Sequence, residues 1–313
     1  MRSIDRKCIT AWFNTRDLGV KMNNDGAFMT RSLAENYPYV PIFQADLKGP
    51  KEEWLALIDL LQFGNINPSS ALRALLLGAY LRQLDFEQMT SDIRAKLNAE
   101  YSPNQAISLI TRHIQGRSNG GSRLLEIAIH SFMQCVIELG TPISCLSGTR
   151  NLAPIKPMRS PDKKAGDIGD IQFRHNKFKD TKGMRFIEYA IDAKYAINEI
   201  GPGITRVLTH INDSNTPQPY LKRIDFIGLE SAPVLLTNSS FNSAVHELAK
   251  RGVQLRLSSL GDMVGELCSS TALSTNWVHR YFSALTREDK GYGIVTEITT
   301  DWVASLGSLL DSN

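Results

Sequence analysis

A carboxylate and an ammonium group lie two residues apart in a largely apolar segment, FIEYAIDAK at 186–194. Side chains alternate between the two faces of a strand, so Asp192 and Lys194 would share one face, roughly 6–7 Å apart along the strand. Burying either group without a partner costs free energy. The pair is therefore predicted to take part in chemistry. The alternative is a surface ion pair on an edge strand, which the apolar surroundings disfavour.

A second acid is available in the preceding strand candidate, 167–173, which contains Asp167 and Asp170. Asp170 shares a face with a polar residue, whereas Asp167 falls on a face with two apolar residues, a pattern typical of a core. Asp170 is preferred as the functional acid, and Asp167 is kept as the alternative. The turn-rich stretch 175–183 can join the two strands as an antiparallel pair, which would place Asp170 beside Asp192.

Two neighbouring carboxylates repel each other unless a cation lies between them. A divalent ion with oxygen ligands is the natural solution, and Mg²⁺ commonly binds one or two carboxylates together with water and phosphate oxygens. Such an ion polarises a phosphodiester and lowers the pKa of a bound water. Lys194 would orient the attacking water or stabilise charge that develops on the phosphorus. These residue types predict metal-dependent hydrolysis of a phosphodiester.

Asp170, followed roughly twenty residues later by Asp192-Ala193-Lys194, resembles the PD-(D/E)xK motif of restriction-endonuclease-like nucleases. Gly169 stands where the motif has proline, a common departure in this family. The literal Pro161-Asp162 lies in a polar loop and ranks third as the first acid. The resemblance covers roughly residues 120–260. It implies that Asp170 and Asp192 bind Mg²⁺ and that Lys194 is catalytic.

Two flanking features add to the resemblance. In this fold a helix before the sheet often contributes a glutamate to the metal site, and Glu126 lies in the apolar helix candidate 123–139. A solvent-facing position for Glu126 is the alternative. The segment 234–255 is similar to the strand–helix–strand unit that closes the core in Mrr-type restriction nucleases. The implied fold class is α/β, with a restriction-endonuclease-like core in which helices flank a mixed β-sheet, plus a helical N-terminal region.

The elements that must position these residues divide the chain into three parts. Residues 1–115 are predicted to be mainly helical, 116–262 to form the nuclease core, and 263–313 to pack back on that core. Alternation of helices and strands after the turn-rich GRSNGGS at 116–122 favours the α/β class. Predicted helices cover 51–61, 71–81, 86–97, 123–139, 204–211 and 241–251. Predicted strands cover 143–146, 167–173, 186–195, 224–229, 234–237 and 253–257.

Composition narrows the function classes. A hydrophobic content of 42% and a charged content of 21% are ordinary for a globular protein, and a net charge of +3 permits a nucleic-acid partner. The four cysteines form no CxxC pair, which favours free thiols. No apolar run reaches the roughly 18 residues of a membrane helix, and no secretory signal is recognised. A cytoplasmic, prokaryotic protein without a membrane partner is predicted. No nucleotide-binding or serine-hydrolase motif is present.

Charged residues around the motif allow further predictions. Glu188 shares the Asp192 face, and a salt bridge to a loop lysine is favoured over a metal role. Between 156 and 185 lysine and arginine outnumber the acids. These basic residues would either contact phosphates or form a solvated loop.

The resemblance implies a type II restriction endonuclease that uses Mg²⁺ to cleave double-stranded DNA at specific sequences. A palindromic target would require a homodimer, with the N-terminal region serving recognition or dimerisation. The alternatives are a repair or modification-dependent nuclease of the same fold, and a non-catalytic DNA-binding module.

Overall fold

The structure is a computed structural model. It describes residues 51–311 apart from gaps at 65, 98, 117–119, 147–150, 156–167, 180–184, 213–218, 231–238, 269, 289–294 and 296–298. The chain divides into two compact units, Met1–Gln88 and Met89–Asn313. The sequence pattern instead suggests a boundary near residue 115. The difference arises because α5 (Pro103–Gln115) buries Leu109 and Ile110 in the second unit.

The described part of the first unit consists of α3 (Lys51–Phe63) and the first part of α4 (Pro68–Lys96). Two separate helices at 71–81 and 86–97 were expected, and this expectation is wrong because α4 is continuous. The segment RQLD between them contains no glycine or proline that would end a helix. The boundary between the two units falls within α4.

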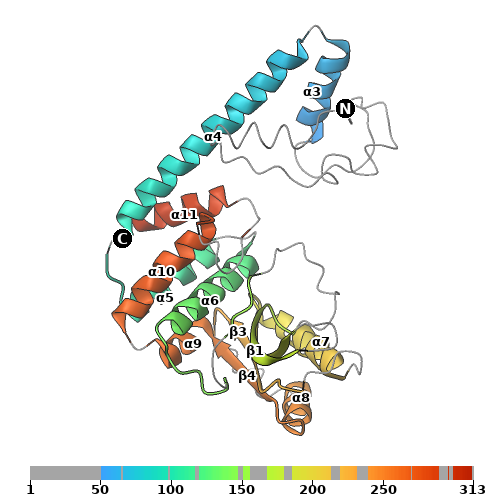
Figure 1. The fold of residues 1–313 in the computed structure, drawn as a ribbon, viewed down its shortest axis with the longest axis vertical. Coiled ribbons are helices and arrows are strands. Elements are labelled where there is room, and N and C mark those ends of the chain that lie inside the picture. Colours follow the sequence, from blue (N-terminus) through green and yellow to red (C-terminus); the bar gives the residue numbers. More distant parts are fainter. Residues whose placement is uncertain are drawn as a thin grey trace. The chain divides into compact units, whose positions relative to one another are not determined.

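A mixed sheet lies at the centre of the second unit (Figure 1). Its described strands follow the order β1-β2-β3-β4. The first pair is antiparallel, and β3 and β4 then add in parallel. The bounds are Ile171–Lys179 for β1, Arg185–Ala193 for β2, Arg223–Gly228 for β3 and Gln254–Ser259 for β4. The α/β class and the mixed sheet are therefore confirmed.

Helices cover both faces of this sheet. On one face α6 contacts β1 and β2, and α9 contacts β3 and β4. On the other face apolar residues of α7 and α8, including Val207 and Leu248, share a core with Ile224 and Phe226 of β3. The sheet is thus a layer between helices, as Figure 1 shows. The helix bounds are Gly121–Glu138 for α6, Ile200–Asn212 for α7, Ser239–Ala249 for α8 and Leu260–Leu267 for α9.

The C-terminal helices pack against α6 and α5. Helix α10 (Thr271–Leu285) buries Trp277, whose indole N–H donates to the Ala128 carbonyl at 2.9 Å. Helix α11 (Thr300–Asp311) places Trp302 within reach of α5, because His113 Nε2 lies 2.8 Å from the Trp302 carbonyl oxygen. Because α5 and α10 pack on α6 opposite the sheet, α6 is buried on nearly every side, although the sequence predicted an amphipathic helix. None of the described helices is long and apolar enough to cross a membrane.

Two strand predictions differ from the structure, and a third falls on residues that the structure does not describe. Residues 143–146 form a turn rather than a strand, directly after Pro142. Strand β1 continues to Lys179 where a turn from residue 175 was expected, because register shifts after Phe173 and Arg174 absorb the irregular pairing. The expected strand at 234–237 lies outside the described residues.

Candidate active site

Asp170 lies in a bend immediately before β1, not inside the strand as the sequence pattern suggested. Its amide N–H donates to the Ile191 carbonyl at 2.9 Å, and its Oδ2 accepts from the Ala193 N–H at 2.9 Å. Backbone and side chain are therefore both fixed to β2. The expected antiparallel pairing is confirmed, and it brings Asp170 beside Asp192.

Gly169 makes this close approach possible. Its φ is +71°, and a Cβ atom there would lie 2.7 Å from the Ile191 carbonyl oxygen. Proline fixes φ near −65°, so it cannot adopt this conformation. The departure from the proline of the resembled motif thus has a physical reason in the backbone.

The buried pair Asp192 and Lys194 closes the site. Their side chains are 2% and 10% exposed, and the ammonium group forms an ion pair with Asp192 Oδ1. The shared strand face predicted for this pair is therefore confirmed. The Lys194 N–H donates to the Ile227 carbonyl at 2.9 Å, which extends the β2–β3 pairing by one residue. The backbone that carries Lys194 is thereby held at the carboxyl edge of two parallel strands.

The buried charge of Asp192 affects the ionisation of Asp170. The pKa of Asp170 is raised from 3.8 to about 7, chiefly by burial and then by the charge of Asp192 and a hydrogen bond with that residue. Lys194 and the Ala193 N–H act in the opposite direction. Near neutral pH, negative charge on Asp170 is therefore opposed by its burial and by the charge of Asp192. A bound divalent cation would relieve this repulsion.

Helix α7 covers the site and adds two residues that the sequence pattern did not identify. The half-exposed Arg206 places Nη2 at 3.7 Å from Asp192 Oδ2. Gly203 lies over the Asp192–Lys194 pair, one helical turn before Arg206. The sequence signal that points to them is the unusual Gly201-Pro202-Gly203 near the start of a helix that follows the D-x-K segment.

Gly203→Ala tests how tightly α7 closes the site. An added Cβ would lie 2.8 Å from Phe226 Cε1 and 2.9 Å from Lys194 Cε, so one of these side chains must move. We expect stability to fall by about 1–3 kcal/mol. If the site has the phosphodiesterase activity that the sequence predicts, the rate per folded molecule should fall by about tenfold or more when Lys194 shifts by about 1 Å.

The matched control is Gly265→Ala in α9, where nothing lies within 4 Å of the added Cβ. That control should keep whatever activity the site has, and its free energy of unfolding should rise by about 0.5–1 kcal/mol. Urea unfolding measures the change in stability, and initial rates with a phosphodiester substrate measure the change in the predicted activity. Equal behaviour of the two variants would show that α7 does not restrain Lys194.

A cavity of about 450 Å³ opens beside Lys194. It lies at the carboxyl ends of β2 and β3, since Lys194 follows β2 and Gly228 ends β3. Its polar lining includes Gln115, Tyr195, Asn198 and Glu230. The Lys194 side of the site is thus next to a space large enough for part of a substrate.

The other candidate acids are placed differently. Glu126 pairs with Arg123 on its own helix at 2.5 Å. Among the residues that the structure describes, no three His, Cys, Asp or Glu side chains gather where they could hold a metal ion, so Glu126 does not join the two aspartates in one such cluster. Asp167 and Pro161-Asp162 lie outside the described residues. Glu188 forms the expected salt bridge, with Lys222 at 2.7 Å.

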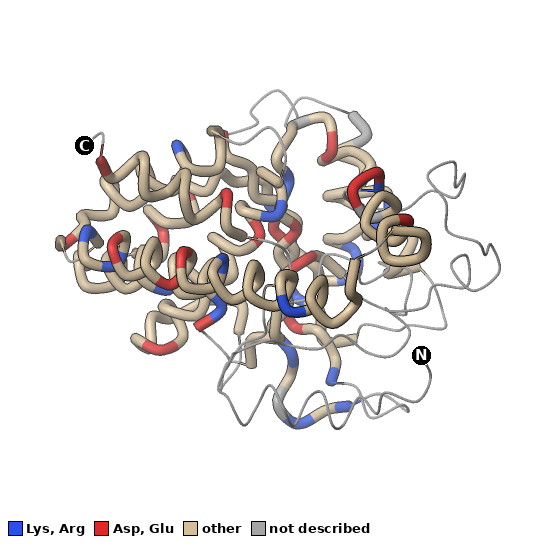
Figure 2. Tube along the Cα trace, turned by 90° about the horizontal axis from the view of Figure 1, so that it is seen from above, with Lys and Arg blue, Asp and Glu red and all other residues tan. Residues whose placement is uncertain are grey.

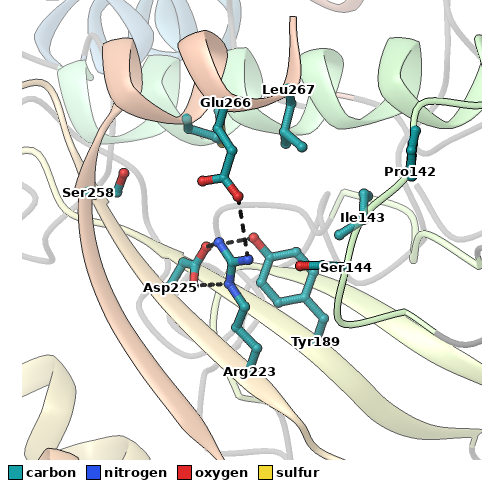
Figure 3. Close-up of a pocket in the computed structure, with 10 residues that line it drawn as sticks. Pro142, Ile143, Ser144, Tyr189, Arg223, Asp225, Ser258, Glu266 and Leu267 are labelled. Atoms are coloured by element: carbon teal, nitrogen blue, oxygen red, sulfur yellow. Dashed lines mark hydrogen bonds and ion pairs between the residues drawn. The ribbon is translucent and has the colours of Figure 1, made fainter.

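A second cavity, of about 170 Å³, lies on the opposite face of the sheet (Figure 3). Figure 3 shows Arg223 between Asp225, Glu266 and the ring of Tyr189. Asp225 accepts from Arg223 Nε at 2.7 Å and from the Tyr189 hydroxyl at 2.8 Å. Tyr189 is three residues before Asp192 on β2, so the two side chains face opposite ways. The buried charges here satisfy one another, which is typical of a structural network.

Asp225→Asn is therefore expected to destabilise the fold. It would leave the buried Arg223 guanidinium without its main counter-charge, because Glu266 is 3.9 Å away. The expected loss is about 3 kcal/mol in the free energy of unfolding, measured with urea. Any phosphodiesterase activity of the aspartate–lysine site should stay within about twofold of wild type per folded molecule, since the network does not reach the aspartate pair. A large loss of that activity at unchanged stability would assign this cavity a functional role instead.

Neither a scan against protein-family models nor a search of curated proteins found a match to this chain.

Proposed function

We propose that this protein is a Mg²⁺-dependent endodeoxyribonuclease, specifically a type II restriction endonuclease of the PD-(D/E)xK class. The observation that carries the proposal is the meeting of Asp170, Asp192 and Lys194 at the end of an antiparallel strand pair. The antiparallel β1–β2 pair extended by parallel β3 and β4 supports a restriction-endonuclease-like core. The resemblance in the sequence supports the same assignment.

The residues present fit a hard divalent cation. Asp170 and Asp192 offer carboxylate oxygens, and the raised pKa of Asp170, caused by burial and by the charge of Asp192, indicates a site that favours added positive charge. When bound, Mg²⁺ would polarise the phosphodiester and acidify a coordinated water. These two carboxylates would hold the ion, with water and phosphate oxygens completing its coordination.

The chain's own residues have separate tasks in the proposed reaction. Water adds to phosphorus and one P–O bond breaks, which yields a phosphomonoester and an alcohol. The Lys194 ammonium group would donate a hydrogen bond to the attacking water or to a phosphate oxygen as negative charge develops. Asp170 is held by the Ala193 N–H, and Asp192 is flanked by Lys194 and Arg206, so little reorganisation is needed. Sequence-specific cutting of a palindrome would further call for a homodimer.

The proposal is tested by digesting a fully sequenced phage DNA with the purified protein and Mg²⁺, and then mapping the fragment ends. Discrete fragments with a common end sequence are expected. Random nicking would contradict the restriction assignment, and no cutting at any Mg²⁺ concentration would contradict the nuclease assignment. Parallel digestion of methylated and damaged DNA separates a restriction enzyme from a repair or modification-dependent nuclease.

A further inference from the structure

The outer half of the β1–β2 hairpin extends beyond the rest of the sheet. Pairing between β2 and β3 begins at Tyr189 and Arg223, whereas β1 and β2 pair again at Lys179 and Arg185, beyond a register shift that follows Arg174. Arg185 lies seven residues before Asp192 on the same strand. At about 3.3 Å per residue this separation is roughly 23 Å. The hairpin is therefore an arm that starts at the candidate active site and ends well away from it.

The end of this arm is basic. Lys177, Lys179 and Arg185 are exposed, and no described acidic side chain forms an ion pair with any of them. Glu188, the acid of the described arm, is already paired with Lys222. These three basic residues, together with the aromatic side chains that support them, are called the basic tip below. Figure 2 marks the lysines and arginines in blue and the acids in red.

An aromatic stack supports the basic tip. The rings of Phe178 and Tyr220 are parallel within 5° with centroids 4.9 Å apart, and His175 packs against both. His175 Nδ1 also accepts from the backbone N–H groups of Lys177 and Phe178 at 3.1 and 3.3 Å. Phe186 adds a fourth ring against Tyr220. These hydrogen bonds and ring contacts hold the backbone that carries Lys177 and Lys179. Less conformational entropy is therefore lost when a ligand binds the two lysines.

We propose that the basic tip binds the sugar–phosphate backbone of duplex DNA about seven base pairs from the scissile phosphate. Three exposed cations complement a polyanion. The number of base pairs follows from the 23 Å separation and a rise of about 3.4 Å per base pair. The inference rests on the proposed function, because the reach is counted from the candidate active site. Such contacts set register on the duplex and carry no sequence information.

The test compares two triple variants by fluorescence anisotropy, using a 30-base-pair duplex and EDTA so that no cleavage occurs. Lys177→Gln, Lys179→Gln and Arg185→Gln remove the basic tip. Lys96→Gln, Lys250→Gln and Arg251→Gln remove equal charge elsewhere in the same unit. Each lost phosphate contact should reduce the slope of log K against log salt by about 0.9, so the tip variant should lose about 2–3 in slope. The control variant should keep the wild-type slope.

Three outcomes overturn the proposal: an unchanged slope in the tip variant, an equal loss in the control variant, or a loss of affinity for single-stranded DNA with duplex affinity unchanged. Cleavage then gives an independent readout. Wild type should reach its half-maximal cleavage rate at a lower concentration of a duplex that extends ten base pairs beyond the mapped cut than of a duplex that extends four. The tip variant should need the same concentration of both duplexes. If the tip variant loses salt-dependent duplex binding but wild type cuts no DNA, only the nuclease proposal is contradicted. If wild type cuts DNA but the tip variant keeps the wild-type slope of log K against log salt, only the proposal for the basic tip is contradicted.

Discussion

Replacing Lys194 with methionine should lower Mg²⁺-dependent cleavage by about 100- to 1,000-fold, the loss typical of removing one preorganised donor to a developing charge. Methionine keeps most of the buried aliphatic volume, so the loss reports the missing ammonium group. Duplex binding in EDTA should stay near the wild-type value. The measurement is single-turnover cleavage, scaled to the folded fraction at the assay temperature.

Lys222→Met is the matched control for this experiment. Lys222 also pairs with a buried carboxylate of β2, that of Glu188. The Lys222 side chain is 46% exposed, however, and Lys222 directly precedes β3, at the end of that strand away from the candidate active site. We expect its cleavage rate to remain within about twofold of wild type, because a partly exposed ion pair contributes little and reaches no reacting atom. A Lys194→Met enzyme that cuts at the rate of Lys222→Met would remove Lys194 from the mechanism.

Replacing Asp170 with asparagine should have opposite effects on activity and on metal-free stability. The asparagine oxygen can still accept from the Ala193 N–H, while the charge that repels Asp192 disappears. Cleavage should be lost because one of the two metal-binding carboxylates is gone. In EDTA at pH 8 the variant should be more stable than wild type by about 2–4 kcal/mol. The reason is that the pKa of Asp170 is about 7 in the folded chain and 3.8 without the fold, so ionised Asp170 destabilises the folded wild type.

The stability difference between Asp170→Asn and wild type should increase with pH. Below about pH 4 Asp170 is protonated in both the folded and the unfolded chain, so wild type and variant should differ little. Between pH 4 and about 7 the folded chain binds a proton that the unfolded chain has released, so wild-type stability falls as pH rises. Urea unfolding at pH 4.5, 6 and 8 should therefore show a growing gap between the proteins. A gap that is constant or reversed in sign would contradict the account of the carboxyl pair.

The alternation of side chains along a strand was enough to predict from the sequence that Asp192 and Lys194 lie together. Asp192 and Lys194 are two residues apart on a buried strand, and strand geometry alone requires them to share a face. Asp170 was chosen on the assumption that it lies inside a strand, yet it lies in a bend. The left-handed conformation of Gly169 holds it there. Such a backbone conformation depends on the contact with Ile191, which local pattern does not encode.

Features that depend on packing between distant segments could not be read from the pattern. Gly203 and Arg206 reach the site only because α7 lies over the carboxyl edge of the sheet. The turn-like composition after residue 175 suggested a loop, but the aromatic stack with Tyr220 supports a strand there. Propensity is a weak guide where tertiary contacts of this kind decide the structure.

The most direct test of the central claim is a parallel cleavage assay on a duplex that contains a mapped cut site. Wild type, Asp170→Asn and Lys194→Met are each incubated with Mg²⁺ and with EDTA, at equal folded concentration. Wild type with Mg²⁺ should cleave the duplex, and on the same time scale the other five reactions should show no cleavage. Cleavage by wild type in EDTA, or cleavage by either variant at the wild-type rate with Mg²⁺, would contradict a metal-dependent nuclease site built from Asp170, Asp192 and Lys194.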